Sequence, residues 1–142
     1  MDNGRIVELY MEAVEHRDLE KVRELMHPDV VGRYPQSGEV FRGRDNYMGM
    51  QEAYPGLPQA EASSVTGETS MVVLPSTLPF GKPTITVFGG EHFVIEGMAT
   101  YPNGDVYNVV LILRLEGGKV IEETTYFAAP FDAPEWRKAY SE

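Results

Sequence analysis

The sequence predicts an α+β domain in which helices from the first part of the chain pack against a curved antiparallel or mixed β-sheet built by the second half. Apolar residues recur at three- and four-residue spacing in the first 26 residues, which is typical of amphipathic helices. From residue 63 on, β-branched and aromatic runs alternate with Gly and Pro turns, which is typical of strands. A chain of 142 residues without cysteine can bury a core without disulfides, so we expect one domain over residues 1–142.

Two helices and a hairpin are predicted first. One apolar face runs along residues 3–16, formed by Ile6, Val7, Tyr10, Ala13 and Val14. Asp18 is the expected N-cap of a second helix, which ends at "HPD" because the residue before a proline disfavours the helical region. "VVGRYP" and "EVFRG" flank "QSG" as a hairpin, and Asp45 is the expected cap of a third helix that ends before Pro55.

Five runs of strand-forming residues follow: "SSVTGETSMVVL", "TITVF", "EHFVIEGMATY", "DVYNVVLILRL" and "KVIEETTYF". The Asn-Gly of "YPNGDVY" and the glycines of "EGGK" predict tight turns between consecutive antiparallel strands. The three prolines of "PSTLPFGKP" indicate a stiffened loop at the edge of the sheet.

The tail predicts a short C-terminal helix. Asp132 and Glu135 have capping-box spacing, Pro134 fits the first turn, and Phe131 and Trp136 occupy the two positions of a hydrophobic staple. We expect this helix to fold back over an open end of the sheet, to lie on a partner subunit, or simply to cap the C-terminus.

Composition excludes several function classes. Twelve Lys and Arg against 22 Asp and Glu give a formal charge of −10, which predicts no nucleic-acid or anionic-membrane partner. The N-terminus lacks the pattern of an export signal and no apolar run approaches the ~18 residues of a membrane span, so we expect a cytoplasmic protein. No His, Asp or Glu cluster has ligand spacing and cysteine is absent, so we expect neither metal nor cofactor.

The expected order, α-α-β-β-α-β-β-β-β with a short C-terminal helix, resembles the nuclear transport factor 2-like superfamily, also called SnoaL-like. The residues that carry the resemblance are "LYMEAVEHRDLEKVRELMHPDVV", "YPQSGEVFRGRDNY", "YPNGDVYNVVLILRLEGGKVIEETTYF" and "APFDAPEW". It implies a cone-shaped sheet wrapped around the N-terminal helices, a hydrophobic pocket inside the cone, and a homodimer. Members carry out different reactions or none, so the activity must be argued from the site.

The resemblance to ketosteroid isomerase fails at two positions. "RDLEKV" resembles the "GDL" that starts the second helix in the superfamily, and this alignment puts Tyr10 at the oxyanion tyrosine. It also puts Tyr34 at the position of the base and Leu111 at the position of the oxyanion carboxylic acid. A proton shuttle without its base loses most of its rate, so we do not expect this reaction.

Other members of the superfamily fit only in part. Epoxide hydrolase would need an Asp where this chain has Thr125, with Glu96 and Glu123 as the nearest substitutes and no obvious inward Arg. Scytalone dehydratase would need two pocket histidines, and only His92 is placed to reach a pocket. The polyketide cyclases imply one acidic residue near the end of the last strand, and Glu123 with Thr125 is the closest match.

Strand alternation separates the adjacent carboxylates Glu122 and Glu123. If Thr125 points inward, Ile121, Glu123 and Phe127 also point into the cone, whereas Glu122, Thr124 and Tyr126 point outward. We expect burial to raise the pKa of Glu123 and to leave Glu122 near its ordinary value. The alternative is a structural role for Glu123, paired with Arg33, Arg42 or Arg114 or hydrogen-bonded by a tyrosine.

Two hypotheses about function remain. The first is a small enzyme of isomerase, cyclase, hydratase or hydrolase type that carries out acid–base chemistry on an apolar oxygenated ligand. Its expected catalytic residues are Glu123, Tyr10 and Tyr34, and its expected ligand-binding residues are Leu111, Thr125, Phe127, Glu96, His92 and Trp136. The second is a non-catalytic ligand-binding or assembly module that forms a homodimer through the outer face of its sheet.

Overall fold

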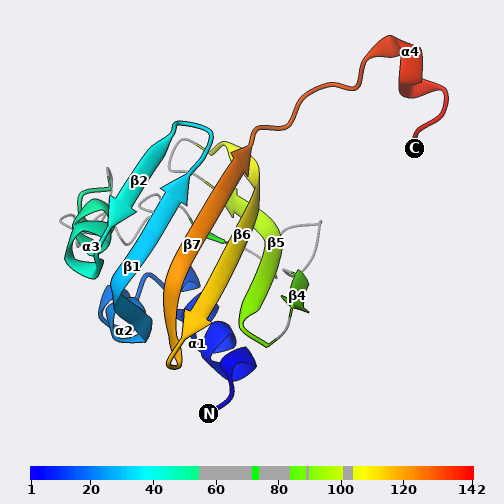
Figure 1. Ribbon diagram of the computed structural model, residues 1–142. Coiled ribbons are helices and arrows are strands. Elements are labelled where there is room, and N and C mark those ends of the chain that lie inside the picture. The colour runs from blue at the N-terminus through cyan, green and yellow to red at the C-terminus, as the bar shows by residue number, and fades with distance from the viewer. Residues whose placement is uncertain (55–71, 74–83, 89, 101–103) are drawn as a thin grey trace.

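The computed structural model describes residues 1–54, 72–73, 84–88, 90–100 and 104–142 (Figure 1). Most of the strand expected over residues 63–74 and the proline-rich loop at 75–83 lie outside the described residues. The same is true of residues 101–103 of the expected Asn-Gly turn.

Three helices lie within residues 1–54, the first described segment: α1 (Asn3–Glu15), α2 (Leu19–Leu25) and α3 (Arg44–Glu52). The Asp2 carboxylate caps α1 by accepting from the Arg5 amide at 2.9 Å, and Asp18 caps α2 by accepting from the Lys21 amide at 3.1 Å. The cap expected at Asp45 is wrong, because α3 begins at Arg44 after Gly43 and has no side-chain cap. None of the described helices is long and apolar enough to cross a membrane.

The described residues form seven strands of one mixed sheet. They are β1 (Met26–Tyr34), β2 (Glu39–Arg42), β3 (Val72–Val73), β4 (Thr84–Phe88), β5 (His92–Thr100), β6 (Val106–Glu116) and β7 (Lys119–Ala128). The order is β2-β1-β7-β6-β5-β3, and β4 also pairs with β5. β1 runs parallel to β7 and every other described pair is antiparallel. This confirms the predicted α+β class, and the two-residue β3 lies within the run expected to form a strand over residues 63–74.

The helices cover one face of the sheet, and the core lies between them (Figure 1). Alternate residues of β6 point into this core, namely Val109, Leu111, Leu113 and Leu115, all of them buried. Burying one such leucine contributes about 1.5–3 kcal/mol. Tyr10 from α1 and Tyr47 from α3 are also almost fully buried, so two phenol groups lie inside a core of mostly apolar side chains.

A bulge interrupts the pairing of β6 with β7 near their turn. Arg114 lies opposite Glu122 and Leu115 lies opposite Val120, so Ile121 is an extra residue in β7. The inward position expected for Ile121 falls at this bulge, where Ile121 is half-buried and Val120 is the fully buried residue. Beyond the bulge the predicted alternation holds, with Glu123 and Thr125 buried.

The C-terminal tail does not return to the sheet. It leads away from the end of β7 to α4 (Glu135–Lys138), which lies apart from the rest of the described protein (Figure 1). The expected capping box is wrong, because α4 has no side-chain cap and begins after Pro134. Phe131 and Trp136 do not form the expected staple over a buried surface, since their exposed fractions are 79% and 75%.

Candidate functional site

The site is built around Glu123, which points from β7 into the core with an exposed fraction of 5%. The Tyr10 hydroxyl from α1 donates a hydrogen bond to Glu123 Oε2. Burial raises the pKa of Glu123, and the hydroxyls of Tyr10, Tyr47 and Thr125 oppose that rise. No Lys, Arg or His in the described part of the chain forms an ion pair with Glu123. The carboxyl is therefore held by a phenol and not by a cation.

Tyr10 and Tyr47 keep their protons. Burial raises the pKa of each phenol well above its ordinary value, and the nearby Glu123 raises it further. Both hydroxyls therefore remain hydrogen-bond donors. The Tyr10 proton is directed at Glu123, so the donor that was expected to serve a ligand is hydrogen-bonded to the carboxyl in this structure.

Gly32 on β1 makes room for Tyr47. A Cβ atom added at Gly32 would clash with Cε2 of the Tyr47 ring, so only glycine lets the ring lie against the strand. The ring of Tyr47 also meets Phe41 of β2 edge-on, with the ring centres 6.1 Å apart. These contacts fix the direction in which α3 presents its phenol to Glu123.

A small inner cavity of about 30 Å³ lies beside Glu123. This volume holds about one water molecule or one polar tip of a ligand. The Thr125 hydroxyl is buried, and its Oγ1 makes no hydrogen bond of acceptable geometry to any described residue. The cavity walls combine α1, α2 and α3 with β1, β6 and β7 through Tyr10, Val14, Arg17, Leu19, Val22, Tyr34, Tyr47, Gln51, Val109, Leu111, Glu123, Thr125 and Phe127.

A larger outer pocket of about 320 Å³ adjoins the inner cavity, because Tyr34, Gln51 and Phe127 line both. Its remaining walls are Gln36, Ser37, Glu39, Met50 and Tyr54. Tyr34 and Phe127 meet edge-on with their ring centres 5.4 Å apart. A pocket of this size with mostly apolar walls is typical of small-molecule sites.

The wall of the outer pocket is tied to the end of β7. The side-chain amide of Gln36 donates to the Phe127 carbonyl, and the Phe127 amide donates to the Gln36 side-chain oxygen. This reciprocal pair continues the contact of β1 with β7 beyond the last backbone pairing. It holds Phe127 at the boundary between the two spaces.

The family model described as a SnoaL-like domain matches residues 7–123, which is most of the chain and includes the buried glutamate. The chain belongs to the SnoaL-like domain family. No curated protein matches the sequence.

Solved structures with the same fold agree with this assignment. An NTF-2 like protein of unknown function from Burkholderia xenovorans LB400 is 26% identical, with a TM-score of 0.74, over 99% of this chain and 93% of the other. A candidate ketosteroid isomerase from Kribbella flavida is 19% identical, with a TM-score of 0.71, over 99% of this chain and 87% of the other. An LEH-like epoxide hydrolase from M. tuberculosis is 15% identical, with a TM-score of 0.58, over 87% of this chain and 80% of the other. The last two likenesses show the fold alone.

This SnoaL-like domain brings six of its nine expected site residues together. Tyr10, Tyr34, Leu111, Glu123, Thr125 and Phe127 all line the inner cavity. His92 and Glu96 lie instead on the opposite, exposed face, because Phe93 and Ile95 are the residues of β5 that point inward. Trp136 lies on the tail, away from both spaces.

The outer face of the SnoaL-like domain pairs Glu122 with Arg114. The guanidinium Nε of Arg114 lies 3.1 Å from a Glu122 oxygen, and this hydrogen bond lowers the pKa of Glu122. The expectation that Glu122 keeps its ordinary pKa is therefore wrong. Arg114, considered from sequence as a partner for Glu123, is held by the neighbouring carboxylate on the other face.

Three polar wall residues of the SnoaL-like domain were not expected from sequence: Arg17, Tyr47 and Gln51. Arg17 carried a signal, since it stands where the superfamily's "GDL" has glycine. Tyr47 carried a weaker one, because Gly32 within a strand often marks a close approach of another group. Gln51 is an ordinary helix residue, and nothing in its local sequence indicates a pocket. In the described part of the SnoaL-like domain, no three His, Asp or Glu side chains are grouped to hold a metal ion.

Proposed function

We propose that this protein is an acid–base enzyme that moves a proton on a small, largely apolar, oxygenated molecule. The observation that carries the proposal is Glu123, a buried carboxyl with a raised pKa, hydrogen-bonded by Tyr10 beside a cavity that adjoins a ligand-sized pocket. A general base works best when its pKa lies near the working pH, and burial moves Glu123 in that direction.

In the proposed reaction the apolar body of the substrate occupies the outer pocket and its reacting end enters the inner cavity. The Glu123 carboxylate takes a proton from a carbon of the substrate or from a water molecule in the inner cavity. The electron pair of the broken bond stays on that carbon or on the water oxygen, and Glu123 returns a proton in a later step. Tyr10 and Tyr47 orient the carboxyl, and Thr125 offers its hydroxyl to the reacting oxygen.

A second candidate is a module that binds a ligand without turnover. The size of the inner cavity favours it, because about 30 Å³ leaves little room for a substrate beside Glu123. In that case the outer pocket of about 320 Å³ alone would hold the ligand.

The test begins with native mass spectrometry of the purified protein, to identify a small molecule carried through purification. Wild type, Glu123→Gln and Glu122→Gln are then compared for turnover of that molecule, of an epoxide and of a β,γ-unsaturated ketone. We expect Glu123→Gln to abolish turnover while Glu122→Gln retains it. Equal turnover in all three proteins overturns the role of Glu123, and a retained ligand that no variant converts favours the binding module.

A further inference from the structure

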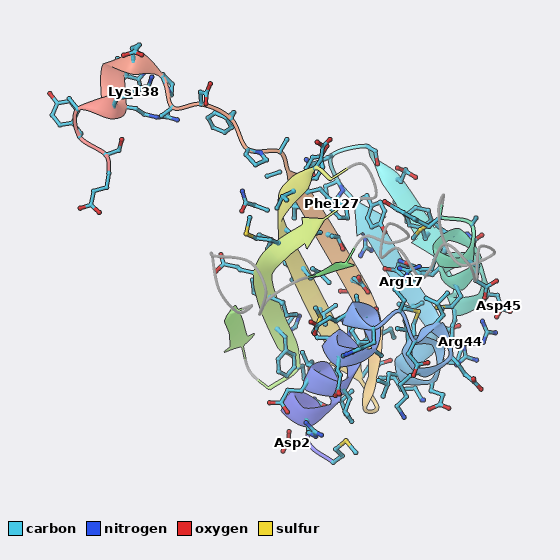
Figure 2. All side chains as sticks on the ribbon, turned by 180° about the vertical axis from the view of Figure 1, so that it is seen from behind. Asp2, Arg17, Arg44, Asp45, Phe127 and Lys138 are labelled. Atoms are coloured by element: carbon cyan, nitrogen blue, oxygen red, sulfur yellow. The ribbon has the colours of Figure 1, made fainter. Side chains whose placement is uncertain are left out.

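Arg17 lies where α1 ends and the chain turns into α2, on the helix-covered side of the sheet (Figure 2). The Arg17 amide donates to the Val14 carbonyl at 3.2 Å, and the Asp18 amide donates to the Ala13 carbonyl at 2.9 Å. This is a Schellman turn with Arg17 at the position that usually holds glycine. Its φ of 56° makes Arg17 the only non-glycine residue with positive φ in the described part of the chain.

The left-handed backbone makes arginine a costly choice at this position. Any residue with a Cβ atom is crowded against its own backbone in this conformation. Such strain tends to persist where the side chain has a function. The Arg17 side chain lines the inner cavity together with Glu123. Glycine would suit this turn, so the backbone conformation does not explain why an arginine stands at position 17. The explanation must come from its side chain.

The guanidinium of Arg17 lacks a counter-ion in the described part of the chain. Its two terminal nitrogens donate to the side chain and carbonyl of Gln51, both at a long 3.3 Å. Its Nε is buried and has no hydrogen-bond partner among the described residues. No described carboxylate lies within ion-pair distance, and the ionisable groups that influence Arg17 are the phenols of Tyr34, Tyr47 and Tyr54.

Glu123 is not the counter-ion of Arg17. It borders the same cavity, but Arg17 is not among the groups that shift its pKa, and its partner is Tyr10. Among the described residues that line the two spaces, the other carboxylate is Glu39 of the outer pocket, which accepts a hydrogen bond from Ser37 at 2.6 Å. A half-buried cation with no carboxylate partner among the described residues, in a protein of charge −10, is suited to an anion from outside the chain.

We infer that the substrate carries a carboxylate, which Arg17 binds, on an apolar body that fills the outer pocket. The inference rests on the proposed function, because it names the substrate class of the same site. Arginine binds carboxylates with two parallel N–H···O bonds, and the unpartnered Nε provides one of the donors. The aromatic walls at Tyr34, Tyr54 and Phe127 favour an aryl or similarly flat body next to the charged group.

Binding of 4-phenylbutyrate and of its uncharged amide, 4-phenylbutyramide, tests the inference by isothermal titration calorimetry. Wild type should bind the carboxylate at least about tenfold more tightly than the amide, as expected for a charge-assisted pair. Arg17→Gln keeps length and polarity and should bring the two affinities together. Arg42→Gln, on the exposed β2, is the matched control and should keep the preference.

Arg17→Gly tests whether Arg17 recognises the carboxylate or only stabilises the fold. Glycine relieves the positive φ, so this variant should melt at or above the wild-type temperature while losing the preference for the carboxylate. A clear drop in melting temperature with the preference intact would make Arg17 a structural residue and overturn the inference. Equal affinity of wild type for the two probes, or no binding of the carboxylate at millimolar concentration, overturns it as well.

Glu123→Gln distinguishes this inference from the proposed function. The variant should keep the preference for the carboxylate, since Arg17 and the outer pocket are unchanged. If Glu123→Gln keeps both the preference and full turnover, the proposed catalysis fails and the recognition by Arg17 stands. If it loses turnover while Arg17→Gln still prefers the carboxylate, the catalysis stands and the recognition fails.

Discussion

Glu122 and Glu123 are neighbours on β7, and the sheet sends them into different surroundings. Glu122 lies on the outer face beside Arg114, and that hydrogen bond lowers its pKa. Glu123 lies inside beside Tyr10, and burial raises its pKa. The two carboxyls should therefore change the stability of the protein in opposite directions as the pH changes.

For Glu123 we expect the free energy of unfolding to fall as the pH rises from the ordinary glutamate pKa of 4.5 to the raised pKa of the folded protein. In that window the unfolded chain has released the proton while the folded protein still binds it. Glu123→Gln removes this loss and should be at least as stable as wild type at neutral pH. Thermal melts across the pH range, with a carboxyl titration by NMR, check both points. Strong destabilisation by Glu123→Gln together with a lowered pKa would mean that the carboxylate is charged and paired.

Glu122 provides the comparison. Its pKa is lowered, so its contribution is present above the ordinary value of 4.5 and is lost as the pH falls through the folded-state pKa. The pair is partly open to solvent, with 28% of the Arg114 side chain and 38% of the Glu122 side chain exposed. Glu122→Gln should therefore cost at most about 1 kcal/mol at neutral pH.

Tyr10→Phe tests whether Tyr10 orients the carboxyl. The ring stays and the donor to Glu123 is lost, so the pKa of Glu123 should rise further, because the Tyr10 hydrogen bond lowers it. The variant should lose roughly 1–3 kcal/mol of stability, the usual cost of leaving a buried polar group without its partner. An NMR titration that finds the same Glu123 pKa in wild type and Tyr10→Phe would contradict this role.

At the scale of the elements, the packing of α3 against β1 depends on Gly32, which has no side chain. Gly32→Ala would push a Cβ against the Tyr47 ring, and we expect it to cost about 1–3 kcal/mol and to move the phenol away from Glu123. Gly49→Ala on the exposed face of α3 is the control. Its added Cβ meets no atom within 4 Å, and alanine should stabilise the helix by up to about 1 kcal/mol. Denaturant unfolding of both variants measures the difference, and equal effects would contradict the role of Gly32.

Elements with strong local signals could be predicted from the sequence. The apolar spacing around Tyr10 and the cap at Asp18 specify α1 and α2, and alternation along β7 correctly sends Glu123 and Thr125 inward. The errors have causes outside the local sequence. The bulge at Ile121 depends on how two strands pair, and the exposed tail depends on whether a surface is available to bind it.

The site was predictable only where a side chain's direction follows from its own strand or helix. Glu123 met that condition, because a period of two decides its face. Arg17 and Tyr47 did not, because their place in the cavity depends on the packing of α1, α2 and α3 over the sheet. His92 and Glu96 were assigned to the wrong face of the sheet. Which residues of β5 point inward depends on the pairing of β5 with β6, and the sequence of β5 alone does not show it.

At the scale of the whole molecule, no described element covers the outer face of β6 and β7 (Figure 1). Apolar side chains meet there, since Val110 lies opposite Tyr126, and the exposed fractions of Ile112 and Tyr126 are 36% and 42%. We expect this face to join two copies of the chain, because an open apolar sheet face needs cover.

Light scattering after size-exclusion chromatography at micromolar concentration should report about twice 15.9 kDa. Ile112→Glu places a charge at the centre of the outer face and should give monomers. Val40→Glu, at an exposed residue of the edge strand β2, should leave the dimer intact. A monomeric wild type would contradict the dimer.

The position of Trp136 decides which optical signals can follow this protein. The chain has one tryptophan, and it lies on the tail with 75% of its surface exposed. Its emission should therefore stay that of a solvated indole through the thermal transition, whereas near-ultraviolet circular dichroism of the buried Tyr10 and Tyr47 should collapse. A tryptophan shift that follows the dichroism curve would show that the tail packs on the folded domain. A blue shift that grows with protein concentration, far below the melting temperature, would instead report the tail binding to a second copy.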